Sequence, residues 1–450
     1  MDVITIETAP LGDRSYVVHD GRVALVIDPQ RDTDRVEKAV ANAGVQITHV
    51  AETHIHNDYV TGGLQLARDH HAVYLVNAAD QVDFDRTPIS DGQTLQIGKM
   101  TLRAVATPGH THHHLSYVVT QESRQAVFSG GSLLYGSVGR TDLVRPEDTE
   151  PLTRQQYRSV RRLAGSASAD ATLYPTHGFG SFCSSGPATG AESSTLGEQR
   201  RANHALTEDD EDRFVRELIA GLTAYPSYYA HMGPANTAGP DPAHLDVPQP
   251  LDAEELTARL AHGEWVVDLR NRIAFARDHL HGSASFEYGD GSSFTTFLGW
   301  VLPWDRQLTL VGERDDVEHA IRDLSRIGID QPSVALGSDP AALAPRAARS
   351  SYPSVGWEEG RADRAPEDVI LDVRRTDEYN AQHIDGAINL PLHELLHRMG
   401  EVPDQRLWVH CGSGYRASVA ASLLQRGGKD VVHIDGRFDD AEKAGLPMNG

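Results

Sequence analysis

Short apolar runs rich in Val, Ile and Leu alternate with turn residues over residues 1–182. Two such runs within residues 17–27 flank an Asp-Gly pair, which predicts two strands joined by a tight turn. Helical spacing of apolar residues appears at residues 35–43 and 155–163. Further strands are predicted at residues 48–52, 73–76, 100–106, 115–119, 126–129 and 172–175. The pattern therefore predicts a strand-rich domain with few helices over residues 1–182.

The pattern changes after residue 182. Small polar residues come first, residues 208–222 then show helical periodicity, and residues 233–250 are rich in Pro, Gly and Ala. We therefore expect a helical extension followed by a linker over residues 183–250.

Two similar units follow this linker. The run WVVDLR at residues 265–270 corresponds to VILDVR at residues 369–374, and a His-x-x-Gly turn and a second apolar run follow each of them. The same elements in the same order indicate an internal repeat of a small α/β domain with a parallel sheet. We expect the first copy at residues 251–338 and the second at residues 352–450.

Composition and charge exclude some classes of binding partner. The chain has 450 residues, of which 39% are hydrophobic, as in globular proteins of several domains. A formal charge of −23 would repel nucleic-acid phosphates, so no nucleic-acid partner is expected. No apolar run approaches the roughly 20 residues that span a bilayer, and MDVITIETAP lacks the features of a signal peptide. We expect a cytoplasmic protein without a membrane partner, and leave a homo-oligomer open.

The chain contains two cysteines, Cys183 and Cys411. A disulfide scaffold is therefore not expected, and reduced thiols fit a cytosolic protein. Cys183 lies six residues after His177 and is expected to be a passive thiol, with a role in a sulfur relay as the alternative.

Cys411 opens a glycine-rich loop between a predicted strand and a helix predicted at residues 417–426. Such a loop points backbone N–H groups and a helix N-terminus at an anion, and Arg416 adds positive charge. We expect Cys411 to be a nucleophile and Arg416 to assist it. The residues between them, which would form the binding loop, are Gly412, Ser413, Gly414 and Tyr415.

The six-residue span from Cys411 to Arg416 resembles the active-site loop of rhodaneses, which are sulfurtransferases. Asp372, Arg374 and the segment at residues 383–391 also resemble that family. The resemblance implies a cysteine persulfide held by the loop. Phosphatase loops that begin with His-Cys are one residue longer, so we prefer sulfur transfer to dephosphorylation.

The first copy of the repeat has Gly312 where the second has Cys411, and acidic residues follow it. Without a thiol this copy cannot hold a persulfide. We therefore expect a catalytically inactive rhodanese-like domain with a structural or docking role.

Histidines cluster in the first domain. His54, His56 and Asp58 occur within THIHND, just after a predicted strand, and the segments TPGH and PTH add His110 and His177. Imidazoles and a carboxylate on strand-end loops are ligands for a first-row transition metal. We expect the neighbouring residues His112 to His114 to be loop histidines, with a role in metal or substrate binding as the alternative.

These motifs over residues 1–182 resemble the metallo-β-lactamase superfamily. The resemblance implies an αββα sandwich with a metal at one edge, His54 and His110 as ligands, and His56, Asp58 and His177 at further metal-site positions. GRTD at residues 139–142 resembles persulfide dioxygenases, and so does the order of domains. The resemblance to persulfide dioxygenases implies one transition metal, with Fe(II) expected and zinc as the alternative. It also implies that Arg140 binds the substrate carboxylate.

Two residues depart from the family pattern. Tyr59 stands where two-metal hydrolases have a histidine, which favours a mononuclear site. Gly131 stands where the family has its aspartate ligand, so His56 or a nearby carboxylate would have to complete the iron face.

The expected function is oxidation of a low-molecular-weight thiol persulfide, such as glutathione persulfide, to sulfite, coupled to sulfur transfer through Cys411. The partners would be the persulfide, sulfite and thiosulfate. Two alternatives stay open. The first is a metal-dependent thioester hydrolase of the hydroxyacylglutathione type fused to a rhodanese. The second is a metal-free binding module in which only the rhodanese is active.

Overall fold

The computed structural model describes residues 1–186, 189–289, 292–304 and 306–450. The chain folds into two compact units. The first unit holds residues 1–243 and 325–328, and the second holds residues 244–324 and 329–450.

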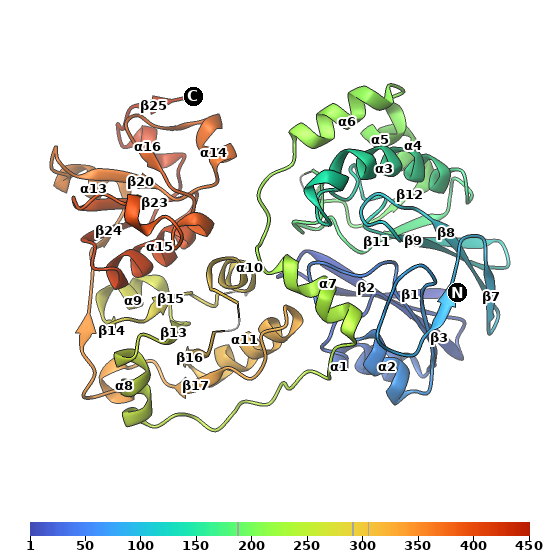
Figure 1. The fold of residues 1–450 in the computed structure, drawn as a ribbon, viewed down its shortest axis with the longest axis horizontal. Helices are drawn as coiled ribbons and strands as arrows, with labels where there is room; N and C mark the ends of the chain where they lie inside the picture. Colours follow the sequence, from blue (N-terminus) through green and yellow to red (C-terminus); the bar gives the residue numbers. More distant parts are fainter. Residues whose placement is uncertain (187–188, 290–291, 305) are drawn as a thin grey trace. The chain divides into compact units, whose positions relative to one another are not determined.

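Two six-stranded sheets form the first unit (Figure 1). Across one sheet the strands are, in order, β1 (Asp2–Thr8), β2 (Asp13–His19), β3 (Val23–Ile27), β4 (Gln46–Ala51), β5 (Val73–Asn77) and β6 (Thr87–Ile89). Across the other they are β12 (Ser194–Thr195), β11 (Thr172–Pro175), β10 (Arg124–Gly130), β9 (Leu115–Gln121), β8 (Met100–Ala106) and β7 (Thr94–Ile97). The predicted hairpin is β2–β3, which pair antiparallel.

Alternating side chains pack one face of each sheet against the other. Tyr16 and Leu25 from the first sheet share one buried cluster with Leu102, Tyr117 and Phe128 from the second. The rings of Tyr16 and Phe128 meet edge to face, with centroids 5.3 Å apart. This core between the sheets fixes the strand ends from which the site loops emerge.

Helices cover the outer faces of the two sheets. They are α1 (Asp34–Ala43), α2 (Gly63–Asp69), α3 (Thr149–Ala164), α4 (Leu196–Ala202), α5 (His204–Thr207) and α6 (Glu211–Ala220), with the short η1 (Pro146–Asp148) before α3. A further helix, α7 (Tyr229–Ala238), contacts the loop after β4 through Asn236. Val36 of α1 packs with Val26 of the first sheet, and Val160 of α3 packs with Val118 of the second. The layers are therefore helix, sheet, sheet and helix, as the αββα expectation requires.

The structure corrects the sequence prediction for the segment after residue 182. Residues 233–250 were expected to be a linker, yet α7 extends through residue 238. The reason is a tertiary anchor, because the buried Asn236 side chain donates to the backbone oxygens of His56 (2.9 Å) and Tyr59 (2.8 Å). The helices α4 and α5 were likewise not predicted from their small and polar sequence.

The internal repeat appears in the second unit as two parallel sheets with the same strand order. The first copy has β15 (Ala284–Ser285), β13 (Trp265–Asp268), β16 (Leu308–Gly312) and β17 (Ser333–Leu336). The second copy has β22 (Ile388–Asn389), β20 (Val369–Asp372), β23 (Leu407–His410), β24 (Val431–Ile434) and β19 (Ser354–Val355). The residue after β23 is Cys411, and β16 ends at Gly312, so these positions are structurally equivalent.

Helices flank both sheets of this repeat. They are α8 (Ala253–Ala261), α9 (Arg272–Arg277), α10 (Ser292–Val301), α11 (Arg314–Arg326), α12 (Pro340–Leu343), α13 (Trp357–Asp363), α14 (Thr376–Ala381), α15 (Tyr415–Arg426) and α16 (Asp440–Lys443). The short pieces are η2 (Leu392–Glu394), η3 (Met399–Glu401), and the strand pairs β14 (His279–Leu280) with β18 (Arg349–Ser350) and β21 (His383–Ile384) with β25 (Met448–Asn449). Among the helices in the described ranges, none is both long and apolar enough to cross a bilayer.

Candidate metal centre and cysteine loop

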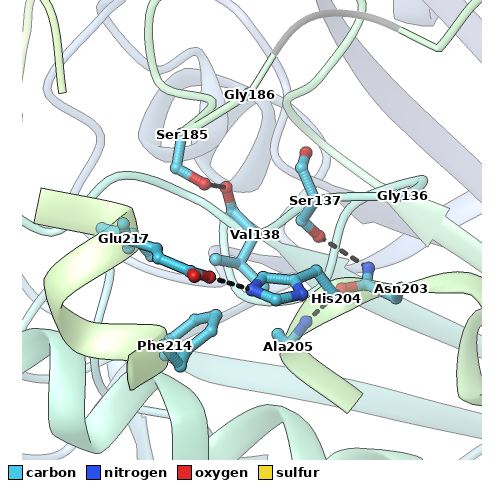
Figure 2. Close-up of a pocket in the computed structure, with 11 residues that line it drawn as sticks. Gly136, Ser137, Val138, Ser185, Gly186, Asn203, His204, Ala205, Phe214 and Glu217 are labelled. Atoms are coloured by element: carbon cyan, nitrogen blue, oxygen red, sulfur yellow. Dashed lines mark hydrogen bonds and ion pairs between the residues drawn. The ribbon is translucent and has the colours of Figure 1, made fainter. Parts of the chain in front are cut away.

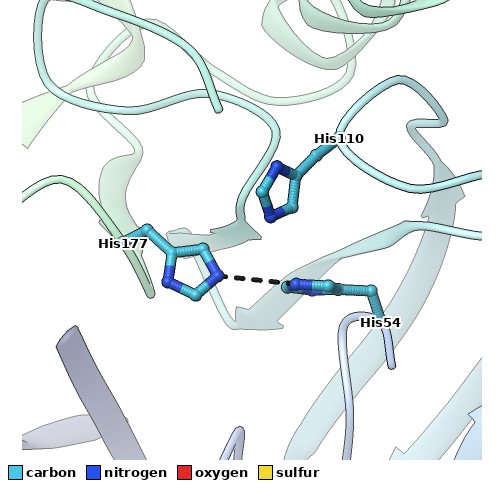
Figure 3. Close-up of side chains that lie close together, drawn as sticks. All are labelled: His54, His110 and His177. Atoms are coloured by element: carbon cyan, nitrogen blue, oxygen red, sulfur yellow. Dashed lines mark hydrogen bonds between the residues drawn. The ribbon is translucent and has the colours of Figure 1, made fainter. Parts of the chain in front are cut away.

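Three histidines meet where strands of both sheets end. His54, His110 and His177 follow the C-terminal ends of β4, β8 and β11, and all three side chains are buried. Their ligand nitrogens lie within 4.8 Å of one another. The Nε2 atoms of His54 and His177 are 3.4 Å apart, and the ring of His110 faces both (Figure 3). Such a spacing is that of ligands around one cation.

The other nitrogen of each ring has a partner that fixes its orientation. Nδ1 of His54 lies 2.8 Å from Oγ1 of Thr53, and Nδ1 of His110 donates to the backbone oxygen of Arg140 at 2.8 Å. Nδ1 of His177 lies 2.8 Å from a carboxylate oxygen of Asp13. Partners of this kind set the tautomer and aim Nε2 at a metal.

Burial controls the charge of these rings. It lowers the pKa of His110 to about 3, and burial together with neighbouring histidines holds the pKa of His54 well below its usual range. Burial would also lower the pKa of His177, but the carboxylates of Asp58 and Asp13 raise it well above the ordinary value. The rings of His54 and His110 are therefore neutral and could act as ligands, while His177 lies beside two carboxylates, whose negative charge suits a cation.

His56 and Asp58 lie beside this group, where Asp58 faces Nδ1 of His177 at 3.2 Å. They form a second buried group of potential ligands with His177. Nε2 of His56 faces Asp28 at 3.3 Å and Glu52 at 3.4 Å. Burial would lower the pKa of His56, but these two carboxylates raise it to about 9. His56 is thus anchored to an acidic pair, with Nδ1 turned toward Asp58 at 4.0 Å.

Several buried polar atoms at this site have no hydrogen-bond partner among the described residues. They are Nε2 of His110, Nδ1 of His56 and the carboxylate oxygens of Asp58, one of which forms an ion pair with Nδ1 of His177 at 3.2 Å. Buried polar atoms are rarely left unpaired, and a bound cation would satisfy these. The donor set of imidazole nitrogens and a carboxylate fits a first-row transition metal.

Gly131 lies in close contact with the ring of His110, a candidate metal ligand. A Cβ atom at residue 131 would overlap the ring of His110. The family's aspartate therefore cannot be accommodated beside His110 in its present place. Tyr59 also differs from the two-metal pattern, because its ring stacks on His56 at a centroid distance of 4.3 Å and its hydroxyl lies 3.1 Å from Nε2 of His56.

Arg140 is buried and already paired. Its guanidinium donates to both carboxylate oxygens of Asp142 at 2.7 and 2.8 Å, and to the backbone oxygens of Phe182 and Thr223. The guanidinium also lies over the ring of Tyr225, 4.5 Å from its centroid. Binding of a substrate carboxylate would require exchange of Asp142, so this assignment stays a prediction.

Two further predictions concern the thiol of Cys183 and the histidines at residues 112–114. Cys183 is buried, and burial with the charges of Asp58 and Asp13 raises the pKa of its thiol well above the usual value, which fits a passive thiol. His112 and His113 are exposed, but His114 is buried and its ring stacks on His54 at 4.9 Å. Its Nε2 accepts from the backbone N–H of Gly131 at 3.0 Å.

The structure shows part of the geometry that was predicted for the cysteine loop. Cys411 is buried after β23, and the backbone N–H of Gly414 points at its Sγ at 3.2 Å. Gly414 has φ +94°, a conformation that favours glycine, and α15 begins at the next residue. Arg416 forms a bidentate pair with Glu378 at 2.6 and 2.8 Å, so its charge is partly neutralised.

A cavity of about 190 Å³ lies elsewhere on the first unit, between the loop at residues 136–138 and helices α5 and α6 (Figure 2). His204 and Glu217 line it and are 2.8 Å apart. With Glu208 they form an exposed group of potential ligands, but Arg213 already pairs with both carboxylates. The cavity is not lined by any of the three buried histidines.

Sequence reasoning missed the residues that hold the site in place. Asp13 orients His177, Asp28 and Glu52 anchor His56, and Asn236 ties α7 to the backbone of the THIHND loop. Asp28 directly follows the apolar run of β3, a strand-end position that could have pointed to it. Asp13 and Asn236 had no local signal, since they act across large sequence separations.

Two protein-family models match this chain, one in the first unit and one in the second. The metallo-beta-lactamase superfamily model matches residues 10–177, and the rhodanese-like domain model matches residues 358–444. The chain is 30% identical over 230 residues to persulfide dioxygenase ETHE1, mitochondrial, of Bos taurus, which covers 50% of this chain and 81% of that protein.

Another similar protein is named for a different activity, and a solved structure superposes on a larger part of the chain. The chain is 32% identical over 137 residues to atrochrysone carboxyl ACP thioesterase AgnL7 of Paecilomyces divaricatus, covering 29% of this chain but only 43% of that protein. A solved structure, the metallo-beta-lactamase from Staphylococcus aureus subsp. aureus COL, superposes with a TM-score of 0.67 at 26% identity. That match covers 74% of this chain and 99% of the other.

Proposed function

This chain belongs to the persulfide dioxygenase family of the metallo-beta-lactamase superfamily and carries a C-terminal rhodanese-like domain, and from this premise we propose an enzyme of persulfide metabolism. In the first unit a low-molecular-weight thiol persulfide, such as glutathione persulfide, reacts with O2 and water to give the thiol and sulfite. The outer sulfur is oxidised and O2 is reduced. In the second unit Cys411 carries sulfane sulfur.

The observation that supports the first activity is the convergence of three imidazoles on one point. His54, His110 and His177 would hold the metal, and the unpaired Nε2 of His110 is the clearest sign of a missing ligand partner. A bound Fe(II) ion supplies the redox chemistry that oxidation of a thiolate by O2 requires. The chain itself orients the rings through Thr53 and Asp13 and excludes bulk water by burial.

The second activity is supported by the position of Cys411 in a glycine loop before α15, where the backbone N–H of Gly414 points at Sγ. The Cys411 thiolate attacks the sulfane sulfur of thiosulfate, the S–S bond breaks, and sulfite leaves with the bonding electron pair. The product is a Cys411 persulfide, and the N–H of Gly414 faces its inner sulfur, Sγ, at 3.2 Å. In the opposite direction, sulfite takes the outer sulfur from this persulfide to form thiosulfate and frees the thiolate.

A thioester hydrolase is the second candidate, favoured by the likeness to acyl-carrier-protein thioesterases. It would use zinc in place of iron, and the metal would supply a hydroxide at neutral pH. Release of thiol from an acyl-glutathione without O2 uptake would support this candidate. A metal-free module would show neither reaction.

The test combines metal analysis with two assays on the full chain. We expect wild-type protein to hold about one iron per chain and to consume O2 with glutathione persulfide. His177→Ala should lose the iron and the O2 uptake, whereas His204→Ala, in the exposed group, should keep both. Cys411→Ser should keep iron and O2 uptake but lose sulfur transfer from thiosulfate to cyanide.

Two results would contradict the proposal. Iron-loaded wild-type protein that consumes no O2 with the persulfide would remove the dioxygenase activity. Sulfur transfer that persists in Cys411→Ser would show that Cys411 is not the nucleophile.

A further inference from the structure

The inactive copy of the repeat contributes an arginine to an ion pair next to the cysteine loop of the active copy. Nε of Arg272, the first residue of α9, donates to Oδ1 of Asp435 at 2.7 Å. Asp435 directly follows β24 of the active copy. The guanidinium of Arg272 also donates to Glu287 of its own copy at 2.6 Å, which fixes its position. An ion pair therefore joins the two copies at this point.

Asp435 lies directly against the cysteine loop. A Cβ atom added at Gly414 would overlap Oδ1 of Asp435 and would lie 3.4 Å from its Cα atom. The backbone N–H of the same Gly414 points at Sγ of Cys411 at 3.2 Å. A single glycine thus contacts the Asp435 carboxylate with one part of its backbone and the sulfur atom with another.

A further hydrogen bond fixes the position of this glycine. Nε2 of His433 donates to the backbone oxygen of Gly414 at 2.9 Å, because a carbonyl oxygen can only accept. Nδ1 of the same ring lies 2.8 Å from Oγ of Ser354, which fixes the orientation of the ring. Gly414 cannot move away from Asp435 without losing the bond from His433. The carboxylate therefore acts on the loop from a fixed position.

The positive charge around the loop is already shared. Arg416 forms a bidentate pair with Glu378 at 2.6 and 2.8 Å, so its charge is partly neutralised. Gly414 is the N-cap residue of α15, and the partial positive charge of this helix N-terminus lies next to both Cys411 and Asp435. A carboxylate without a counter-ion at this place would compete with the Cys411 thiolate for that charge and disfavour it.

We propose that Arg272 of the inactive copy is a positioning residue for sulfur transfer, because it neutralises Asp435 and so keeps the N-terminus of α15 available to the Cys411 thiolate. This inference rests on the sulfur-transfer activity proposed above. It gives the copy that lacks a thiol a defined role, which is to supply the counter-charge of Asp435.

The experiment measures two properties of the full chain. The first is kcat/KM for sulfur transfer from thiosulfate to cyanide. The second is the rate at which iodoacetamide alkylates Cys411 at pH 7, followed by mass spectrometry of the Cys411 peptide, which reports the reactive thiolate. We expect Arg272→Gln to lower both by about fivefold, the effect of one uncompensated charge near a partly exposed site. Arg272→Lys keeps the charge and should retain most of both.

Asp435 provides the decisive comparison. Asp435→Asn removes the negative charge itself, so both rates should stay within about twofold of wild type. The double variant Arg272→Gln with Asp435→Asn should recover the same rates, since no uncompensated charge is left. An ion pair that only supports the structure predicts equal losses for the two single variants. The two side chains are 25% and 27% exposed, so we expect these variants to fold, and thermal unfolding checks this.

Arg349→Gln is the matched control. It removes the same charge from an exposed pair with Asp278 at 3.1 Å. Asp278 precedes His279, whose ring contacts Gln425 at the end of α15 away from the loop. Both rates of Arg349→Gln should equal those of the wild-type protein.

Three results would overturn the inference. They are unchanged rates in Arg272→Gln, an equal loss in Asp435→Asn, and a double variant as slow as Arg272→Gln. Each of them leaves Cys411 as the nucleophile. Wild-type protein that transfers no sulfur from thiosulfate would instead refute the proposed function, and the alkylation rates would still measure the effect of Arg272 on the thiolate.

Discussion

At the scale of single residues, burial decides which titratable groups can carry charge. His410 precedes Cys411, the proposed nucleophile, and is fully buried between the rings of Trp357 and Phe438, 5.2 and 5.8 Å away. Its Nε2 lies 3.6 Å from Asp372, a carboxylate already paired with Arg374. Burial outweighs this carboxylate and lowers the pKa of His410 to about 4. His410 is therefore a neutral packing residue at physiological pH.

This pKa predicts an acid-sensitive contribution to stability. The unfolded histidine, with a pKa near 6.5, binds a proton before the folded one, so stability falls as pH decreases from about 6.5 to about 4. For one group this amounts to about 2 kcal/mol between pH 7 and pH 5. We expect His410→Leu to reduce the difference in unfolding free energy between pH 7 and pH 5 by about 2 kcal/mol. Urea unfolding followed by tryptophan fluorescence at the two pH values measures this difference. The exposed His262→Leu should leave the dependence unchanged, and an unaltered slope in His410→Leu would refute the assignment.

At the scale of elements, strand ends and helix starts place the chemistry. β10 has a register irregularity between Phe128 and Gly130, and Gly130 has φ +52°. The chain then turns so closely past His110 that residue 131 has no room for a side chain. α7 secures the neighbouring loop through Asn236. The candidate metal ligands thus lie at the ends of strands and helices whose hydrophobic side chains pack outside the site.

Gly131→Ala tests how much depends on this close approach. The added methyl group must displace the ring of His110, so we expect a large loss of bound iron and a destabilisation of about 1–3 kcal/mol. Gly165→Ala is the control, because a Cβ atom there meets only ordinary contacts, beginning at 3.5 Å. Iron content measured by elemental analysis and thermal unfolding would check both variants. Full iron occupancy in Gly131→Ala would mean that His110 is not a ligand.

At the scale of the whole molecule, each unit has its own hydrophobic core. The three histidines of the metal candidate lie in the first unit, and Cys411 lies in the second. The first unit is an αββα sandwich closed by its own helices, while the second unites two copies of one parallel-sheet topology. The candidate metal site and the candidate nucleophile are therefore supported by separate hydrophobic cores.

Metal removal should consequently affect the two cores differently. Bound metal stabilises the state that binds it by about 2.7 kcal/mol when its concentration is a hundredfold above Kd. Chelation should lower the thermal transition of the first unit and leave that of the second unchanged. In His110→Ala the chelator should have no effect on either. A shift of both transitions in the wild-type protein would contradict the separation of the cores.

Local patterns were enough to predict the strands that carry the site, the hairpin β2–β3, the repeat and the glycine loop of Cys411. Alternation of apolar residues and the spacing of turn residues are local properties, and the packed sheets reinforce them. The short strands β1, β6 and β7 and the extent of α7 were not predicted, because their stability comes from neighbours far along the chain. Asn236 in α7 illustrates this dependence.

Motif spacing and strand pattern are local properties, and they suffice to place histidines, an aspartate and a cysteine at strand ends. Long-range packing is needed to bring His54, His110 and His177 together, to pair Arg140 with Asp142, and to stack Trp300 on His393. These contacts join residues far apart along the chain. Their geometry is set by how sheets and helices pack, which no local pattern specifies.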